Sequence, residues 1–292
     1  MWWRLRLMRV LELFSGLGGW RYALQNRGQI VAAYDVSEVA NITYAMNHGD
    51  VPHPKELATI PLAVMAAHGA DTWFMSPPCQ PFCRMGKQEG LEDRRSRAFL
   101  HLMELFRQAP PDRLVLENVE GFLGSSAHAL LTERIRAHGM HQLDLRACPS
   151  RFGLPNQRPR VFIVASRRPL NSLPMPELPT RSLAEYLDAE EDERLYLRPE
   201  VLARYHFGLD LVEPGERRST CFIGGYGRRL VGSGSFLKTP RGVRRFSPSE
   251  VGRLHGLPEG FTFPEALSLE VKYKLLGNGL SIPVAAWALD HL

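Results

Sequence analysis

Five short apolar runs along the first 165 residues most constrain the fold of this chain. They cover residues 10–14, 31–34, 72–75, 114–116 and 161–165, and stretches with helical patterns separate them. This alternation predicts an α/β fold with a doubly wound, Rossmann-like sheet. Ligands bind such sheets at the carboxyl ends of the strands, so the residues that flank these runs are the candidates for a functional site.

A glycine-rich turn follows the first run. Gly16, Gly18 and Gly19 lie between this run and a helical pattern over Trp20–Asn26. Glycines let backbone N–H groups approach a ligand, and a helix N-terminus adds partial positive charge. Asp35 follows about 20 residues later, the spacing at which a carboxylate reaches ribose hydroxyls. Because the sequence lacks a phosphate-binding loop with Lys-Ser or Lys-Thr, a non-phosphorylated nucleoside cofactor is favoured over ATP.

Reactive side chains stand at the ends of the later runs. Cys79 follows the third run inside Ser76–Phe82, a stretch stiffened by prolines. A lone cysteine is more often a buried core residue. Glu117, at the end of the fourth run, could equally be a glutamate with only a structural role. Arg158 and Arg160, before the fifth run, could be a solvated charge pair. Their occurrence together at strand ends favours a catalytic site.

In this order, the segments resemble the motifs of the cytosine-5 methyltransferase family over nearly the whole chain. The resemblance implies an S-adenosylmethionine-dependent sheet domain with a small target-recognition lobe. Cys79 is then the nucleophile that adds to carbon 6 of cytosine, and Glu117 holds the base edge and supplies a proton. Arg158 and Arg160 are implied to support the thiolate. The implied contacts to S-adenosylmethionine are Phe14, Ser15, Gly16, Leu17, Gly18, Gly19, Asp35, Val36, Pro77, Asn278, Gly279 and Val284.

Within that family, the segment Ser219–Gly227 is similar to a signature of the tRNA-aspartate methyltransferase branch, which modifies cytosine 38 of the anticodon loop. The resemblance implies methyl transfer to carbon 5 of a cytosine in tRNA, bound through its anticodon stem-loop. The implied substrate contacts are Asn118, Gln80, Arg84, Cys221, Phe222, Tyr226, Arg228 and Arg229. The sequence departs from the usual motifs at Cys83, Asn156, Ile223 and Gly279, which leaves the fine contacts of the pocket open.

Two other functions remain open on the sequence. One is a DNA cytosine methyltransferase of a restriction-modification system, and the other is a catalytically silent RNA-binding relative. The presence of Cys79, Glu117 and both arginines argues against the silent relative. The signature at 221–227 and the short variable lobe favour RNA, because reading several duplex base pairs usually needs more surface. Weak binding to DNA is compatible with this interpretation.

The distribution of charge agrees with a nucleic-acid substrate. The chain has 36 Lys plus Arg against 31 Asp plus Glu, a modest excess. Between Arg217 and Arg245, however, there are eight basic residues and no acidic one. This segment predicts a phosphate-binding surface, with an ordinary solvated face as the alternative.

Prolines at 169, 174, 176 and 179 mark a linker after the fifth run. We therefore expect a catalytic and cofactor-binding domain over 1–169 and a target-recognition domain over 170–267. The segment 268–292 is expected to return to the catalytic domain.

Cysteine and histidine spacings match no metal motif, so no metal site is expected. The sequence has no signal peptide and no apolar run long enough for a membrane span. A monomer in the reducing cytoplasm, without membrane contact, is the resulting expectation.

Overall fold

The computed structural model describes residues 7–78 and 93–292 of the chain. Contacts divide it into two compact units. The first comprises Met1–Ala147, Pro159–Pro174 and Ala285–Leu292, and the second comprises Cys148–Arg158 and Met175–Val284. The domain boundaries expected from the sequence stay a prediction.

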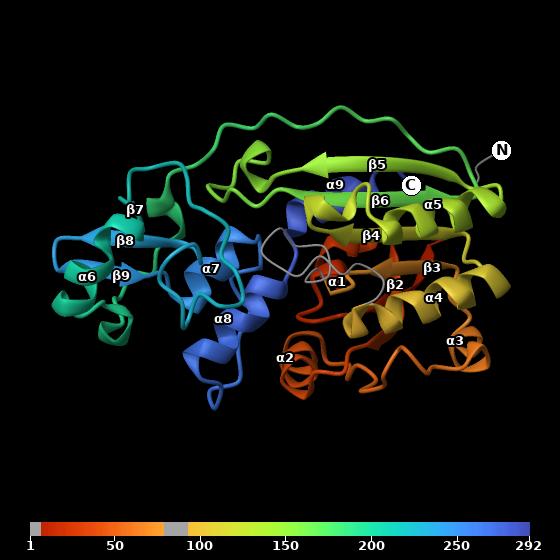
Figure 1. The fold of residues 1–292 in the computed structure, drawn as a ribbon, viewed down its shortest axis with the longest axis horizontal. Coiled ribbons are helices and arrows are strands. Elements are labelled where there is room, and N and C mark those ends of the chain that lie inside the picture. Colours follow the sequence, from red (N-terminus) through yellow and green to blue (C-terminus); the bar gives the residue numbers. More distant parts are fainter. Residues whose placement is uncertain (1–6, 79–92) are drawn as a thin grey trace. The chain divides into compact units, whose positions relative to one another are not determined.

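A six-stranded sheet forms the first unit, in the order β2-β1-β3-β4-β6-β5 (Figure 1). Its strands are β1 (Met8–Leu13), β2 (Gly28–Tyr34), β3 (Thr72–Met75), β4 (Arg113–Asn118), β5 (His141–Ala147) and β6 (Arg160–Ser166). β1 pairs in parallel with β2 and β3, and β3 pairs in parallel with β4. β6 is antiparallel to both β4 and β5. The start of β6 therefore lies at the edge of the sheet where β4 and β5 end.

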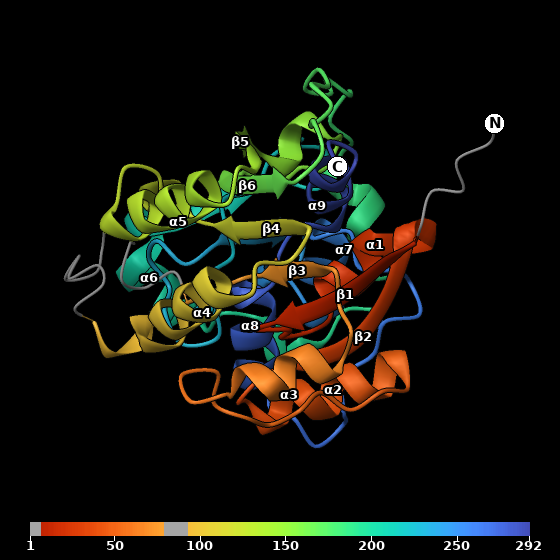
Figure 2. The same cartoon turned by 90° about the vertical axis from the view of Figure 1, so that its right-hand side faces the viewer.

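Helices pack on both faces of this sheet. On one face lie α3 (Leu62–Ala67), α4 (Arg97–Gln108) and α5 (Ser126–Ala137), as Figure 2 shows for α4 and α5. Phe106 and Leu131 belong there to one buried cluster with Leu116 of β4. On the other face, Trp20 of α1 (Gly19–Leu24) packs against Phe74, with ring centroids 5.0 Å apart. Alternate strand residues thus face two different helical layers, as a doubly wound sheet requires.

One further helix and the C-terminal part of another complete the first unit. In α2 (Glu38–His48) the Ser37 hydroxyl accepts a hydrogen bond from Ala40 N, and Gly49 ends the helix with a φ of 80°. The helix is thus capped at both ends. Asp290, just beyond α9 (Ile282–Leu289), pairs with Arg27.

A three-stranded sheet organises the second unit. β7 (Asp210–Val212) is parallel to β8 (Ser235–Thr239), which is antiparallel to β9 (Gly242–Arg245). The helices are α6 (Pro199–Tyr205), α7 (Pro248–Leu254) and α8 (Leu269–Asn278). Short 3-10 helices in the two units cover Gln25–Arg27, Arg94–Ser96, Glu120–Phe122, Pro149–Arg151, Leu183–Tyr186, Glu193–Leu195 and His206–Gly208. In residues 7–78 and 93–292, no helix combines the length and apolar character needed to cross a membrane.

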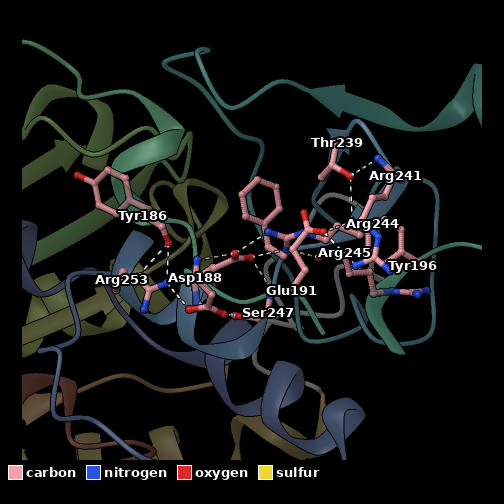
Figure 3. A network of polar contacts seen from close by, with 12 residues as sticks. Tyr186, Asp188, Glu191, Tyr196, Thr239, Arg241, Arg244, Arg245, Ser247 and Arg253 are labelled. Atoms are coloured by element: carbon pink, nitrogen blue, oxygen red, sulfur yellow. Dashed lines mark hydrogen bonds and ion pairs between the residues drawn. The ribbon is translucent and has the colours of Figure 1, made fainter. Parts of the chain in front are cut away.

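A buried polar network holds the start of α7 (Figure 3). The Glu250 carboxylate is paired with Arg244 at 2.7 Å, and their side chains are 0% and 3% exposed. The carboxylate also accepts hydrogen bonds from Ser247 N and Asp188 N. Arg253 binds Tyr186 O and Asp188 on the far side of this network. The Ser-Pro-x-Glu sequence at 247–250 thus forms a capping box that also joins distant segments of the second unit.

Candidate active site

Glu117 and Arg160 meet at the carboxyl edge of the six-stranded sheet. Glu117 is near the end of β4, and Arg160 is the first residue of β6. Arg160 Nε lies 3.3 Å from Glu117 Oε1, and the two side chains are only 14% and 9% exposed. The antiparallel direction of β6 brings these residues together. A partly buried carboxylate is therefore held in place by a guanidinium that compensates its charge.

Asn118 fixes the chain where β3 ends. Its Nδ2 donates a buried hydrogen bond to Pro77 O at 3.0 Å. The indole Nε1 of Trp20 donates to Ser76 Oγ at 2.9 Å. These bonds hold the residues that lead into the predicted nucleophile loop. The Asn118 amide, expected to contact substrate, thus contacts the protein's own backbone here.

Four residues singled out by the sequence fall outside the described part of the chain. They are the expected nucleophile and its neighbours, Cys79, Gln80, Cys83 and Arg84. Their expected roles stay predictions.

Asp35 organises the glycine turn. Its Oδ2 accepts a hydrogen bond from Gly16 N at 2.9 Å, and its Oδ1 accepts one from Ser37 N at 2.8 Å. Burial raises the pKa of Asp35, and these two backbone bonds oppose the increase. The turn itself needs unusual backbone angles, since Phe14 has a φ of 60°. A Cβ atom on Gly18 would lie 2.2 Å from His48 Nε2, so only glycine fits there.

Three observations fit the nucleoside part of S-adenosylmethionine. Among the described residues, the buried Ser15 Oγ has no hydrogen-bond partner. A Cβ atom on Gly16 would meet nothing within 4 Å, so the turn is open on that side. Val36, directly after Asp35, is 62% exposed and offers an apolar contact. Leu17, also predicted as a cofactor contact, is buried.

We predict that Asp35→Ala weakens S-adenosylmethionine binding about tenfold or more, measured by calorimetry. The substitution removes the acceptor for Gly16 N and Ser37 N as well as any contact with the ribose. Asp112→Ala is the matched control, because Asp112 is an exposed carboxylate at the opposite edge of the sheet. Unchanged affinity in Asp35→Ala would contradict the placement of the cofactor at this turn.

Glu12 lies fully buried below the glycine turn. Its Oε2 accepts a hydrogen bond from Tyr44 Oη at 2.9 Å. Burial raises the pKa of Glu12 to about 7, although the Tyr44 hydrogen bond and the charge of Arg21 lower it. Between its ordinary pKa of 4.5 and about 7, the folded protein therefore binds a proton that the unfolded chain has lost.

We predict that Glu12 by itself lowers the free energy of unfolding by about 3 kcal/mol as pH rises from 4.5 to about 7. His48 acts in the opposite direction, because burial lowers its pKa to about 4 and stability should then increase with pH. Glu12→Gln removes only the first effect, so the parent and the variant should differ in slope. Urea unfolding from pH 4.5 to 8 measures this difference, and parallel curves would contradict it.

Arg158 belongs to the second unit and is 2% exposed. Its Nη1 donates to Phe222 O at 3.1 Å and to Cys221 Sγ at 3.2 Å. Its Nη2 donates to Gly277 O at 3.0 Å and also to Gly279 O. The guanidinium thus joins two segments of interest, the signature Ser219–Gly227 and the end of α8, where the expected cofactor contacts Asn278 and Gly279 lie. Its expected support of the thiolate stays a prediction.

The same two segments touch directly. A Cβ atom on Gly277 would lie 2.1 Å from Gly224 N, so the two backbones can approach only because residue 277 is glycine. Phe222 and Tyr226 are buried, and Tyr226 Oη donates to Ser235 O at 2.6 Å. These two aromatic rings are core residues of the second unit.

The remaining expected contacts lie in different surroundings. Val284 is buried. Asn278 is the last residue of α8, and Gly279 follows it as the C-cap. Arg228 and Arg229 are exposed, and Arg228 pairs with Glu270 at 3.0 Å. In the described part of the chain, no group of three or more His, Cys, Asp or Glu side chains is placed to hold a metal.

Comparison with known proteins identifies the family of this chain. The family model described as C-5 cytosine-specific DNA methylase matches residues 8–220 and 213–291. The tRNA (cytosine(38)-C(5))-methyltransferase of Homo sapiens is 31% identical, over 96% of this chain and 97% of that protein. The enzyme of the same name from Schizosaccharomyces pombe is 29% identical, over 98% and 96%.

Solved structures extend the likeness to the fold. The Entamoeba histolytica methyltransferase EhMeth superimposes with a TM-score of 0.93 at 25% identity, and 98% of each chain is covered. The Dnmt2 methyltransferase of S. pombe gives a TM-score of 0.87 at 28% identity, again over 98% of each chain. The expected α/β fold and family are confirmed: this chain belongs to the C-5 cytosine-specific DNA methylase family.

Proposed function

We propose that this protein methylates carbon 5 of cytosine 38 in the anticodon loop of a tRNA. The human and S. pombe relatives that carry this activity in their names are 31% and 29% identical over nearly the whole chain. The observation that carries the chemistry is the Glu117–Arg160 pair at 3.3 Å, a fixed carboxylate at the rim of the sheet. Held there, the carboxyl group can accept a hydrogen bond from the amino group of a pyrimidine and, when protonated, donate its proton to the ring nitrogen.

The residues divide the chemistry between them. When bound, S-adenosylmethionine, the methyl donor of the family, supplies the methyl group that cytosine gains at carbon 5. The glycine turn, Asp35 and Val36 hold the donor. Cys79 adds as a thiolate to carbon 6, which makes the otherwise unreactive carbon 5 nucleophilic. Glu117 binds the base edge and places a proton on N3 as charge develops in the ring. Water then accepts the carbon 5 proton, Glu117 takes back the N3 proton, and the Cys79 sulfur departs as a thiolate, which restores the aromatic base.

An RNA loop suits this chemistry because the target base must leave its stack. An unpaired base costs less to extrude than the few kcal/mol required for a paired one. DNA remains the alternative substrate, since a relative named DNA (cytosine-5)-methyltransferase from Dictyostelium discoideum is 28% identical over 98% of this chain.

Bisulfite sequencing tests the proposal. The protein is incubated with S-adenosylmethionine and total tRNA, and in parallel with duplex DNA at equal concentration. We expect protected cytosine at position 38 of a tRNA with the parent protein and none with Cys79→Ala, which should still bind the donor. If duplex DNA is methylated as fast as tRNA, the DNA methyltransferase interpretation replaces this one.

A further inference from the structure

An aromatic side chain stands out on the second unit. Phe207 is 93% exposed, and Tyr205 is 36% exposed. Directly after them, Leu209 and Val212 are buried in the core of this unit. The chain is therefore held firmly on one side of Phe207, while the ring itself remains in solvent. Scattered exposed apolar residues are common, but a nearly bare aromatic ring among charged neighbours suits a ligand with a flat face.

The residues around Phe207 hold the ring and add positive charge. The His206 ring packs against it, with centroids 3.7 Å apart. His206 Nδ1 donates to Ala203 O at 3.1 Å, which fixes the imidazole on α6. The Arg204 guanidinium lies 5.3 Å from the centre of the Tyr205 ring. Three aromatic rings and a cation thus occupy four consecutive positions.

A second basic segment meets this one. A Cβ atom on Gly208 would lie 2.8 Å from Val231 Cγ2, so the segments 204–208 and 228–231 are in contact. The second segment carries exposed Arg229 and also Arg228, which pairs with Glu270, and it lies within the stretch of eight basic residues without an acidic one. Alternation of exposed aromatic rings and arginines is how proteins bind unpaired nucleotides, through base stacking and phosphate contacts.

We propose that Phe207 is a stacking platform for an unpaired base of the RNA substrate, separate from the base that is methylated. Arg204 and Arg229 would then contact the phosphates on either side of that base. The inference rests on the proposed function, because it takes RNA to be the substrate. The positive charge of the neighbouring segments favours RNA over an apolar protein partner.

The test compares binding to two RNA forms. Fluorescence anisotropy measures the affinity of the full chain for a short single-stranded oligoribonucleotide and for a blunt RNA duplex. Phe207→Ala should weaken single-strand binding about tenfold and leave duplex binding unchanged. Phe207→Trp should restore binding, because its ring can stack. Leu178→Ala is the matched control, since Leu178 is an exposed apolar residue of the same unit, 57% exposed, on a different segment. It should bind both forms as the parent does.

The possible results distinguish failure of the stacking platform from failure of the proposed function. The stacking platform is overturned if Phe207→Ala binds the single strand as tightly as the parent does. It is also overturned if the variant loses as much affinity for the duplex as for the single strand. If the parent methylates tRNA in that case, the proposed function still stands. If the parent methylates only DNA while Phe207→Ala loses single-strand affinity, the platform stands and the proposed function fails. Thermal unfolding checks that the substitution of this exposed side chain leaves the fold intact.

Discussion

Glu117→Gln is expected to lower kcat for tRNA methylation by about 10²- to 10⁴-fold, the usual contribution of a positioned acid or base. Glutamine has nearly the same shape and can still contact the base edge, but its amide cannot deliver a proton to N3. The carboxylate is 9% exposed and lies 3.3 Å from Arg160 Nε, so water cannot easily replace it. Single-turnover methyl transfer, with the protein in excess over tRNA, measures the chemical step.

Two further variants test whether the loss of activity comes from the Glu117 carboxyl group itself or from the residues around it. Glu120→Gln changes an exposed carboxylate three residues further along and should leave the rate unchanged. Arg160→Lys keeps the charge but loses the planar fork that faces Glu117, and we expect a smaller loss than in Glu117→Gln. The double variant should be little slower than Glu117→Gln alone, because contacting residues act together. A rate for Glu117→Gln within a few-fold of the parent would show that another group supplies the proton.

The sequence was most informative where strands are buried on both faces. The runs 72–75 and 114–116 are continuous and apolar, and both lie inside strands of the six-stranded sheet. β5 was not among the predicted runs, because polar and apolar residues alternate along His141–Ala147 at the edge of the sheet. An edge strand has fewer neighbours, so its composition is less constrained.

The site could be predicted only in part. That Glu117 and Arg160 lie at strand ends follows from the sequence, but their 3.3 Å pairing depends on the direction of β6, which no periodicity reveals. Motif similarity also cannot report burial: Phe222 and Tyr226, predicted as substrate contacts, are buried in the second unit. The sequence analysis did not single out Arg204 and the three aromatic residues after it. Their exposure to solvent is evident only in the folded structure.

Glu250→Ala is expected to lower the free energy of unfolding by about 3–5 kcal/mol. The substitution leaves the Arg244 guanidinium, 3% exposed, without its carboxylate. It also removes the acceptor for Ser247 N and Asp188 N, which are drawn together in the network of Figure 3. Urea unfolding followed by circular dichroism measures the loss. Glu259→Ala, at an exposed position of the same unit, should have almost no effect.

The Arg244→Met, Glu250→Leu double variant tests the cause of this lower free energy of unfolding. The cause is either the uncompensated charge of Arg244 or the missing hydrogen bonds. A buried ion pair adds little net stability compared with apolar side chains of similar size, so removing both charges should recover part of the loss. Recovery should be incomplete, because Ser247 N and Asp188 N still lack their acceptor. Full recovery would mean that the ion pair alone explains the effect. No recovery would mean that the Glu250 carboxylate acts mainly as the cap that starts α7 and joins it to residue 188.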